Sequence, residues 1–324
     1  MAKGKRPKQP SRSDSPHFKG TVLRSTGSWY RVRLTDGQIH ECRLRGKMRT
    51  HGIRTTNPIA VGDHVLVGHD DETGYNIFEI EDRTNYVLRK SVNLSKRAHI
   101  LCANIDQAVI LFTIEHPVTT LGYVDRLLLT CEAYHIKPVI LFNKIDLLSA
   151  EGLQRLDDYQ QLYNAAGYEI HAISAKDKGY ADEIREILQG KVSFLVGRSG
   201  AGKSATVNLV APELKLKIGD VSDFSGRGKH TTTFAEMFEL PFGGEIIDSP
   251  GFREMQLFDF EKAELAPLFP EMRNCLDDCR FSNCLHLNEP GCAVKLAVKE
   301  GKIPESRYHT YLGMLQEVEG NIWD

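Results

Sequence analysis

The first part of the chain, from Phe18 to about Arg89, contains short runs in which apolar and polar residues alternate. Alternation with a period of two is typical of strands that bury one face and expose the other. Asp36-Gly37 stands between two of these runs and favours a tight hairpin turn. The expected strands are Thr21–Leu23, Trp29–Leu34, Ile39–Leu44, His64–Val67 and Tyr75–Ile80. Five short strands of this kind predict a small closed β-barrel of the oligonucleotide-binding type (OB-fold).

The pattern changes near Asp106, where continuous apolar runs begin to alternate with segments of helical periodicity. A continuous apolar run is typical of a parallel strand that helices cover on both faces of the sheet. The expected strands are 108–112, 138–142, 169–173, 192–196, 234–240 and 245–247, and the expected helices are 123–134, 152–165 and 181–188. This alternation predicts a doubly wound α/β domain with right-handed crossovers.

The two ends of the chain differ from both of these regions. Residues 1–17 are rich in Lys, Arg, Pro and Ser and poor in apolar residues, so we expect a disordered basic tail. Near the other end, 293–299 and 305–318 have helical periodicity. The chain of 324 residues is therefore expected to be multidomain, with a basic tail (1–17), a barrel (18–90), a central α/β domain (91–255) and a mainly helical C-terminal domain (256–324).

The charge distribution is uneven although the composition is that of an ordinary soluble protein, with 26% charged and 41% hydrophobic residues. Residues 1–54 hold 14 Lys or Arg against three acidic residues, whereas the other 270 residues hold 27 basic and 40 acidic ones. A basic first part on an acidic body is typical of proteins that contact nucleic acid, and a tail that only improves solubility is the alternative. No apolar run is long enough to span a membrane and the basic start lacks the apolar stretch of a signal peptide, so we expect a cytoplasmic protein with no membrane partner.

The predicted barrel carries the residues that such a contact needs, because barrels of this type bind RNA or single strands through basic grooves and stacking aromatic side chains. The RNA-binding candidates are Trp29, Arg31, Arg33, Arg43, Arg45, Lys47 and Arg49. Trp29 and Tyr30 are adjacent in one strand, so one of them faces the core and only the other can stack on a base. The sequence does not tell which. A barrel that docks only on protein is the alternative.

A glycine-rich segment follows the apolar run 192–196 and opens a segment that can be helical. It reads Gly197-Arg198-Ser199-Gly200-Ala201-Gly202-Lys203-Ser204, and Ala205 continues it. In this context the spacing predicts a phosphate-binding loop, because glycines let backbone N–H groups point at phosphate oxygens and the helix start favours anions. Lys203 would reach the β- and γ-phosphates as a catalytic cation, and the Ser204 hydroxyl would bind Mg²⁺. A glycine-rich turn without a ligand is the alternative.

Two polar motifs follow two consecutive expected strands. Asn143-Lys144-Ile145-Asp146 comes after 138–142, and Ser174-Ala175-Lys176 comes after 169–173. Guanine presents two neighbouring donors, N1–H and the N2 amine, and the Asp146 carboxylate can accept from both. Asn143 can reach the other edge of the ring or tie its loop to the phosphate loop, and Ser174-Ala175 can offer a backbone N–H to guanine O6. Together with the phosphate loop, the two motifs predict a guanine nucleotide site.

Asp248-Ser249-Pro250-Gly251 follows the strand 245–247 and has the features of a γ-phosphate sensor. Asp248 can hold Mg²⁺ through water, and the Gly251 N–H can contact the γ-phosphate. A polar, glycine-rich segment, 225–233, precedes it, and one of its threonines, with Thr232 as our choice among Thr231, Thr232 and Thr233, can complete the magnesium shell. The residue after Gly251 is Phe252, which cannot orient a water molecule, so we expect slow intrinsic hydrolysis.

The chain has seven cysteines, and four of them lie between Cys275 and Cys292. Cys279, Cys284, His286 and Cys292 provide three thiolates and one imidazole, which is a donor set typical of a closed, structural zinc site. Cys275 lies outside this spacing and is interpreted as a spare thiol, with substitution as a ligand as the alternative. Cys42, Cys102 and Cys131 are most simply small core residues.

The order of these motifs is unusual. GTPases related to translation factors place the phosphate loop first and the guanine-reading motif fourth, whereas here Asn143–Asp146 precedes Gly197–Ser204. This is a circular permutation. Together with the preceding barrel and the cysteine cluster beyond it, the chain resembles the family of ribosome small-subunit-dependent GTPase A, the RsgA/YjeQ family, over about residues 18–320.

The resemblance implies a GTP hydrolase that the small (30S) ribosomal subunit stimulates and that acts as a late-stage maturation factor, binding rRNA through its barrel and zinc domains. It also implies that Cys279, Cys284, His286 and Cys292 bind one structural Zn²⁺, that Mg²⁺ accompanies GTP, and that His230 is catalytic. The default assembly is a monomer. The permutation joins Asp248 directly to the zinc domain, so we expect the nucleotide state to tilt that domain relative to the barrel.

Two other classes of function stay open on the sequence. The first is a nucleic-acid-binding module that uses GTP only for structural order. The second is a different phosphate-loop enzyme such as a nucleotide kinase, against which Asn143 and Asp146 argue because a kinase needs no guanine reader there.

Overall fold

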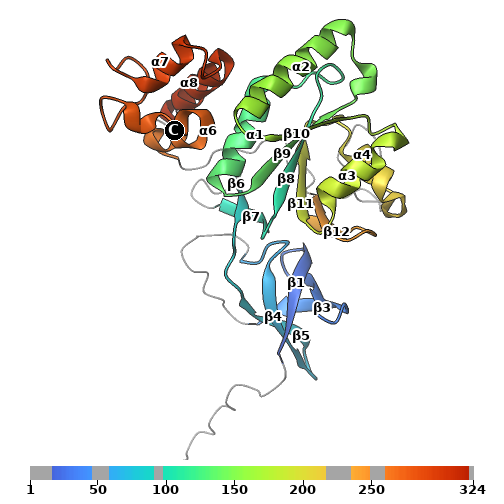
Figure 1. The fold of residues 1–324 in the computed structure, drawn as a ribbon. Coiled ribbons are helices and arrows are strands. Elements are labelled where there is room, and N and C mark those ends of the chain that lie inside the picture. The colour runs from blue at the N-terminus through green and yellow to red at the C-terminus, as the bar shows by residue number, and fades with distance from the viewer. Residues whose placement is uncertain (1–16, 46–57, 91–97, 217–234, 249–259, 321–324) are drawn as a thin grey trace, which may run out of the picture.

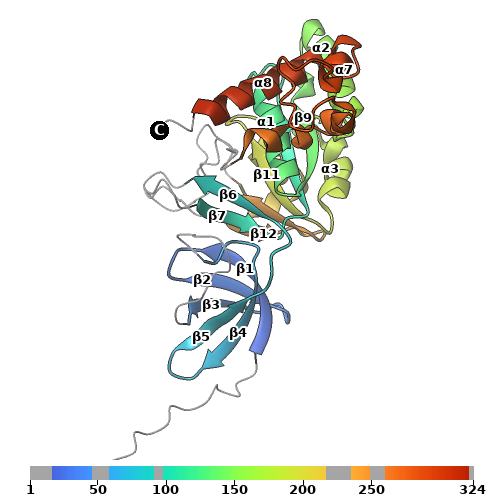
Figure 2. The same ribbon diagram turned by 90° about the vertical axis from the view of Figure 1, so that its left-hand side faces the viewer.

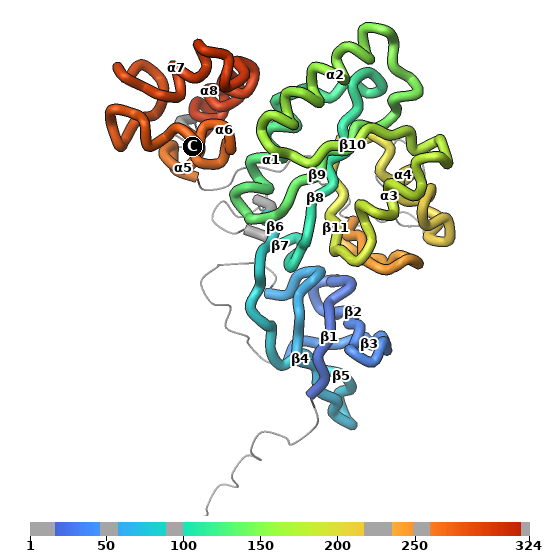
Figure 3. The backbone as a smooth tube through the Cα atoms, viewed as in Figure 1, coloured from blue at the N-terminus to red at the C-terminus, as the bar shows by residue number. Residues whose placement is uncertain are grey.

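The computed structural model describes residues 17–45, 58–90, 98–216, 235–248 and 260–320. They form a barrel, a central α/β domain and a helical C-terminal domain (Figure 1). The barrel lies at one end of the molecule, and the C-terminal domain lies beside the helices of the α/β domain (Figures 2 and 3). Among the described residues, no helix has both the length and the apolar character needed to span a membrane.

The N-terminal unit is a closed five-stranded barrel, as the sequence predicted. Its strands are β1 (His17–Ser25), β2 (Tyr30–Leu34), β3 (Ile39–Leu44), β4 (His64–Asp70) and β5 (Gly74–Ile80). Strand β1 pairs with both β2 and β4, and β3 pairs in parallel with β5, so the ring is complete. Closure leaves no unpaired sheet edge within the ring. The barrel core includes Val22, Val32, Val65, Val67 and Ile77.

The central domain is built on a sheet whose order is β10-β9-β8-β11-β13-β12. The strands are β8 (Gln107–Phe112), β9 (Lys137–Asn143), β10 (Glu169–Ile173), β11 (Val192–Gly197), β12 (Glu236–Glu239) and β13 (Glu245–Asp248). The chain runs outward from β8 to β10 and then crosses back to place β11 on the other side of β8. Open α/β sheets bind ligands at such a switch point, at the carboxyl ends of the strands.

Two pairs of helices cover the two faces of this sheet, as a doubly wound fold requires (Figure 1). They are α1 (Leu121–Ala133) and α2 (Ala150–Ala165) on one face, and α3 (Ala181–Leu188) and α4 (Lys203–Val210) on the other. Successive β8 residues alternate between the two cores: Ile110 and Phe112 join the core that contains α1, and Val109 and Leu111 join the core that contains α3 and α4. The continuous apolar run of β8 therefore serves both faces.

A two-stranded hairpin of β6 (Tyr86–Lys90) and β7 (Ala98–Ala103) was not predicted. It spans the expected boundary at residue 90. Val87 and Leu101 pack in the same core as α1, so the hairpin belongs by packing to the α/β domain. Its strands are five and six residues long, and basic residues interrupt the apolar pattern, which explains why the sequence pattern did not separate them from the barrel.

The C-terminal domain consists of α5 (Lys262–Leu265), α6 (Pro270–Arg273), α7 (Ala293–Lys299) and α8 (Glu305–Gly320), of which the sequence predicted the last two. Single-turn 3₁₀ helices complete the described structure. They are η1 (Ile145–Leu147), η2 (Lys178–Tyr180), η3 (Pro212–Leu214), η4 (Ala266–Leu268) and η5 (Leu276–Asp278).

A buried cluster of charges fastens the C-terminal domain to α1. The Arg307 side chain of α8 is completely buried, and its guanidinium donates to Asp125 Oδ1 of α1 (2.6 Å) and to Glu271 Oε1 of α6 (2.6 Å). Asp125 also accepts hydrogen bonds from Tyr163 Oη (3.0 Å) and Thr310 Oγ1 (2.8 Å). Leu129 of α1 packs in the C-terminal core. The two domains therefore share a desolvated joint.

At the opposite end, the barrel joins the α/β domain through backbone pairing. Strand β1 pairs with β12 at Arg24 and Glu236, so the barrel and the α/β sheet form one sheet of eleven strands. Beside this pairing, the Arg33 guanidinium forms ion pairs with Glu239 and Glu245.

Replacing Arg307 by Ala should destabilise the protein by about 3–5 kcal/mol, because Asp125 and Glu271 would stay buried without their cation. Denaturant unfolding, followed by the fluorescence of the aromatic side chains, measures the change. Arg126→Ala is the matched control, since Arg126 pairs with Glu317 across the same joint with both side chains about half exposed. We expect that control to cost less than about 1 kcal/mol. Equal losses in both variants would contradict the structural role of the buried cluster.

Candidate nucleotide and metal sites

The glycine-rich segment lies where the sequence predicted it, between β11 and α4. Gly197 ends β11, and Gly202 caps the start of α4 in a left-handed conformation with φ of 99°. That conformation favours glycine because it has no Cβ. A Cβ at Gly202 would also overlap Asn143 Nδ2. The helix start and the tight turn together make a geometry suited to anions.

Asn143 links the phosphate loop to both guanine-reading motifs. Its side chain is buried at the end of β9, and its Nδ2 donates to the Ala201 carbonyl (2.8 Å). Its Oδ1 accepts from the N–H groups of Lys144 (2.8 Å) and Ala175 (3.0 Å). Of the two roles open on the sequence, the structure has Asn143 tying the loops together. The Ala175 N–H, one expected donor to guanine O6, is therefore engaged with Asn143.

The other members of the first motif differ in their surroundings: Ile145 packs against the core that contains α1, whereas Lys144 is partly exposed. Lys144 has a left-handed backbone with φ of 65°, and its Nζ donates to the His116 carbonyl (2.7 Å). Ile145 and Asp146 lie in η1, and Asp146 is exposed. An exposed carboxylate at the carboxyl edge of the sheet can accept from a ligand. Ser174, from the second motif, is buried at the end of β10.

A fourth segment at this edge, residues 113–119, was not predicted from the sequence. Arg198 of the phosphate loop donates to the Val118 carbonyl (2.6 Å), and a Cβ at Gly200 would contact Pro117 Cδ at 3.6 Å. Lys144 of the first guanine-reading motif also donates to this segment. Residues 113–119 therefore contact both the phosphate loop and that motif. The contacts use backbone carbonyls, which leave no signal in side-chain identity.

Lys203 and Asp248 lie at the same edge of the sheet, because Lys203 begins α4, which follows β11, and Asp248 ends the neighbouring strand β13. Lys203 Nζ donates to the carbonyls of Gly197 (2.7 Å) and Arg198 (3.2 Å). Burial lowers the pKa of Lys203, and the charge of Asp248 opposes that shift. Asp248 is the last residue of β13 and is 7% exposed.

The remaining predicted residues divide into those that the structure describes and those that it does not. The phosphate loop and the start of α4 contain Ser199, Ser204 and Ala205, of which Ser204 is partly exposed. His230, Thr231, Thr232, Thr233, Gly251 and Phe252 lie outside the described residues.

The four residues predicted to bind a metal come together in the C-terminal domain. One ligand atom from each of Cys279, Cys284, His286 and Cys292 lies within 4.8 Å of the others. His286 Nδ1 is 3.4 Å from Cys292 Sγ and 3.7 Å from Cys279 Sγ. Burial lowers the pKa of His286, which favours the neutral imidazole that metals require. Three thiols and an imidazole in this geometry can hold one metal ion.

The loop that carries His286 is held from two sides. Tyr308 Oη and Tyr311 Oη of α8 donate to the carbonyls of His286 (2.6 Å) and Leu285 (2.8 Å). The Glu289 carboxylate accepts from the N–H groups of Leu285 (2.9 Å) and Leu287 (2.7 Å). These hydrogen bonds hold the backbone of the loop and so orient the His286 imidazole, as hydrogen bonds around metal ligands do in metal sites.

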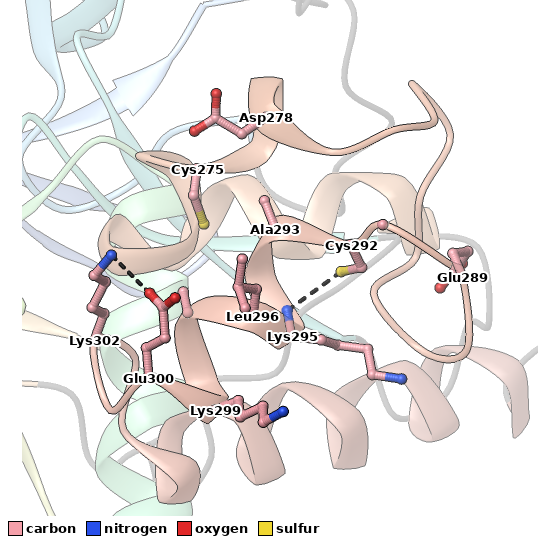
Figure 4. A pocket seen from close by; sticks show the side chains of 12 residues that line it. Cys275, Asp278, Glu289, Cys292, Ala293, Lys295, Leu296, Lys299, Glu300 and Lys302 are labelled. Carbon is pink, nitrogen blue, oxygen red and sulfur yellow. Dashed lines mark hydrogen bonds and ion pairs between the residues drawn. The ribbon is translucent and has the colours of Figure 1, made fainter.

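Cys275 is separate from this set, as the sequence predicted. Its thiol donates to the Met272 carbonyl (3.3 Å). With Cys292, Leu296 and Lys299 it helps to line an open cavity of about 660 Å³ beside α7 (Figure 4). Cys42, Cys102 and Cys131 are buried core residues, also as predicted.

The barrel residues proposed for RNA binding divide into two groups. Tyr30 is buried in the barrel core whereas Trp29 is 41% exposed, so Trp29 is the residue that can stack. The Arg43 guanidinium lies 4.0 Å from the Trp29 ring centroid, and that of Arg45 lies 4.9 Å from the Phe78 centroid. Arg31 and Arg33 instead face acidic residues, Arg33 in the joint with the α/β domain. Lys47 and Arg49 lie outside the described residues.

Comparison with known families gives two matches. A family model described as RsgA GTPase matches residues 80–258, and one described as RsgA N-terminal domain matches residues 19–75. Together they cover most of the barrel, the β6–β7 hairpin and the α/β domain.

Similar proteins cover nearly the whole chain. Proteins named small ribosomal subunit biogenesis GTPase RsgA from Christiangramia forsetii and Bacteroides fragilis are each 46% identical to it, over 94% and 93% of this chain and 98% and 97% of their own lengths. Among solved structures, YjeQ from Thermotoga maritima matches with a TM-score of 0.76 at 31% identity, covering 94% of this chain and 99% of its own. YloQ, described as a circularly permuted GTPase, matches with a TM-score of 0.74 at 28% identity, over 96% and 99%. With the permuted nucleotide motifs gathered at one sheet edge, these matches show that the chain belongs to the RsgA family of circularly permuted GTPases and is a GTP-hydrolysing enzyme.

Proposed function

We propose that this enzyme acts in the maturation of the small (30S) ribosomal subunit, in the cytoplasm, and that the subunit stimulates its GTP hydrolysis. The relatives that are 46% identical carry the name of small ribosomal subunit biogenesis GTPases, and this is the observation that carries the proposal. The exposed Trp29 ring with the Arg43 guanidinium beside it supports rRNA binding by the barrel. The zinc domain would provide a second rRNA contact. We expect the enzyme to act as a monomer.

In this proposal different residues of the chain bind the phosphates, the base and the metal ion. The turn Gly197–Ser204 with Ala205 holds the phosphates, and Lys203 exchanges the loop carbonyls for phosphate oxygens. Asp146 selects guanine, while Asn143 holds the loops together through its hydrogen bonds. Mg²⁺, when bound, neutralises charge between the β- and γ-phosphates. Ser204, Thr232 and Asp248 would hold that ion, and the Gly251 N–H would contact the γ-phosphate.

Phosphate release from GTP with and without purified small subunits tests the proposal directly. We expect release to be slow for the enzyme alone and at least about 10-fold faster with subunits, since a group supplied on docking can complete a GTPase site. Large subunits are the control and should not accelerate release. Binding of GTP without faster release on small subunits would favour a module that uses GTP only for structural order.

Many GTPases keep a water-orienting glutamine at the position that Phe252 occupies here, and His230 is our candidate for that role. Replacing His230 by Ala should therefore abolish the subunit-stimulated part of this turnover. Nucleotide affinity should stay nearly intact, which equilibrium binding of a fluorescent GDP analogue measures. Stimulated turnover at the wild-type rate would remove His230 from the mechanism.

Replacing Asp146 by Asn should change the base that the enzyme accepts. Xanthine has an N1–H donor next to an acceptor oxygen, which matches the mixed donor and acceptor of an amide. We expect kcat/KM for GTP to fall at least about 100-fold and turnover of xanthosine triphosphate to exceed that of GTP. Glu151→Gln, a change in an exposed acid of the neighbouring helix, is the matched control. An unaltered preference for GTP in the Asp146 variant would contradict the assignment.

We also propose that the metal held by Cys279, Cys284, His286 and Cys292 is one structural Zn²⁺. Metal analysis should find about one zinc per chain, and Cys284→Ser should lose it because a closed site needs all four ligands. Cys275→Ser is the matched control and should keep it. Chelation should lower the thermal unfolding midpoint of the wild type, since metal binding stabilises the fold. A metal-free wild type, or loss of zinc in the Cys275 variant, would contradict this ligand set.

A further inference from the structure

The hairpin of β12 and β13 lies between the barrel and the nucleotide site. Strand β12 pairs with β1 of the barrel on one side and with β13 on the other. In this pairing Arg24 lies opposite Glu236, and Glu236 lies opposite Asp248, so one row of the sheet runs from the barrel to Asp248. The position of Asp248 therefore depends on how the hairpin is held by its neighbours.

Arg33 of the barrel holds the far end of this hairpin. Its guanidinium forms ion pairs with both Glu239 and Glu245, which face each other in the register of β12 and β13. Two carboxylates at directly opposed positions repel each other. One planar guanidinium with several donors can bridge both of them. The Arg33 side chain is only 22% exposed and that of Glu245 only 15%, so water screens the contact with Glu245 weakly.

The neighbouring arginines make looser contacts with the hairpin. Arg24 is 3.9 Å and Arg31 is 4.0 Å from Glu236, and Arg31 is closer to Glu41 of the barrel, at 3.3 Å. Within the described residues, Arg33 is the barrel side chain that bridges both strands of the hairpin.

We propose that Arg33 is a positioning residue for GTP hydrolysis. It holds the β12–β13 hairpin so that Asp248, at the end of β13, stays in the position from which it would bind Mg²⁺. The inference rests on the assignment of Asp248 to Mg²⁺ in the proposed function. It gives Arg33 a role that differs from RNA contact, because its guanidinium faces the α/β domain, and it makes the barrel a structural part of the hydrolytic machinery even without RNA.

The test is a magnesium titration of GTP hydrolysis by the full-length protein without ribosomes. Arg33→Ala should raise the Mg²⁺ concentration for half-maximal hydrolysis about 10-fold, the size of effect that loss of an outer partner has on metal sites. Arg33→Lys should give a smaller rise, since an ammonium lacks the planar fork that pairs with both carboxylates. The affinity for GDP in EDTA should stay within about 2-fold of the wild type in both variants.

Three further variants separate positioning from a general loss of structure. Lys19→Ala removes an ion pair with Glu81 inside the barrel, distant from the hairpin, and should leave the titration unchanged. Exchange of charges in Arg33→Glu with Glu245→Arg should restore much of the wild-type magnesium requirement. Asp248→Asn should raise that requirement at least as much as Arg33→Ala.

The outcomes are distinct. A raised requirement in Asp248→Asn with an unchanged one in Arg33→Ala would overturn the positioning role alone. An unchanged requirement in Asp248→Asn would overturn the assignment of Asp248 and this inference with it, whereas the subunit and guanine tests would still stand. Parallel loss of GDP affinity in EDTA and of hydrolysis in Arg33→Ala would also overturn the inference, because it would indicate a general structural defect.

Discussion

The nucleotide site depends on one buried amide. Asn143 donates to the Ala201 carbonyl of the phosphate loop and accepts from the backbone of Lys144 and Ala175. Three loops that follow three different strands are joined in this way. Because parallel strands end at the same edge of a sheet, the loops meet there whatever the order of the strands along the chain. Circular permutation therefore changes which elements adjoin the site in sequence and leaves its geometry intact.

What the permutation does change is the environment of Asp248. The strand that carries it, β13, lies between β11 and β12, and β12 pairs with the barrel. After β13 the chain continues to the C-terminal domain. That domain is fastened to α1 by the buried Arg307 cluster, and α1 begins directly after the segment 113–119 that contacts the phosphate loop. The barrel is thus connected to the nucleotide site through the β12–β13 hairpin, and the C-terminal domain is connected to it through α1. The chain order led us to expect a tilt of the C-terminal domain relative to the barrel. A tilt that also moved this domain against α1 would have to separate Arg307 from Asp125, a desolvated ion pair.

Much of this could be predicted from the sequence. Strand β10 and the helices α3 and α7 have the predicted bounds, because their hydrophobic periods are clear and turn residues flank them. The motif residues Gly202, Asn143 and Asp146 can be singled out in the sequence because phosphate and guanine chemistry restricts which residues can occupy those positions. Cys279, Cys284, His286 and Cys292 come together as their spacing and donor types predicted for a metal site.

Other features could not be predicted, and the reasons are physical. An arginine in an alternating strand has the same sequence pattern whether its guanidinium faces RNA or a neighbouring domain, so the sequence does not separate Arg33 from Arg43. Trp29 and Tyr30 fit either face, and only the barrel register buries Tyr30. The Arg307 joint depends on tertiary contacts with Asp125 and Glu271, which lie far away in sequence. The contacts of segment 113–119 use backbone carbonyls, which any residue provides.

The barrel, the α/β sheet and the C-terminal domain together form one packed frame around the nucleotide site. The most direct test is the distance between a spectroscopic label at exposed Glu79 of the barrel and one at exposed Lys299 of α7, attached without cysteine chemistry. It would be measured with GDP and with a non-hydrolysable GTP analogue and Mg²⁺. We predict one distance that agrees between the two states to within about 2 Å. A shift larger than about 5 Å, the size of a discrete switching movement, would show instead that the outer domains move with the nucleotide state.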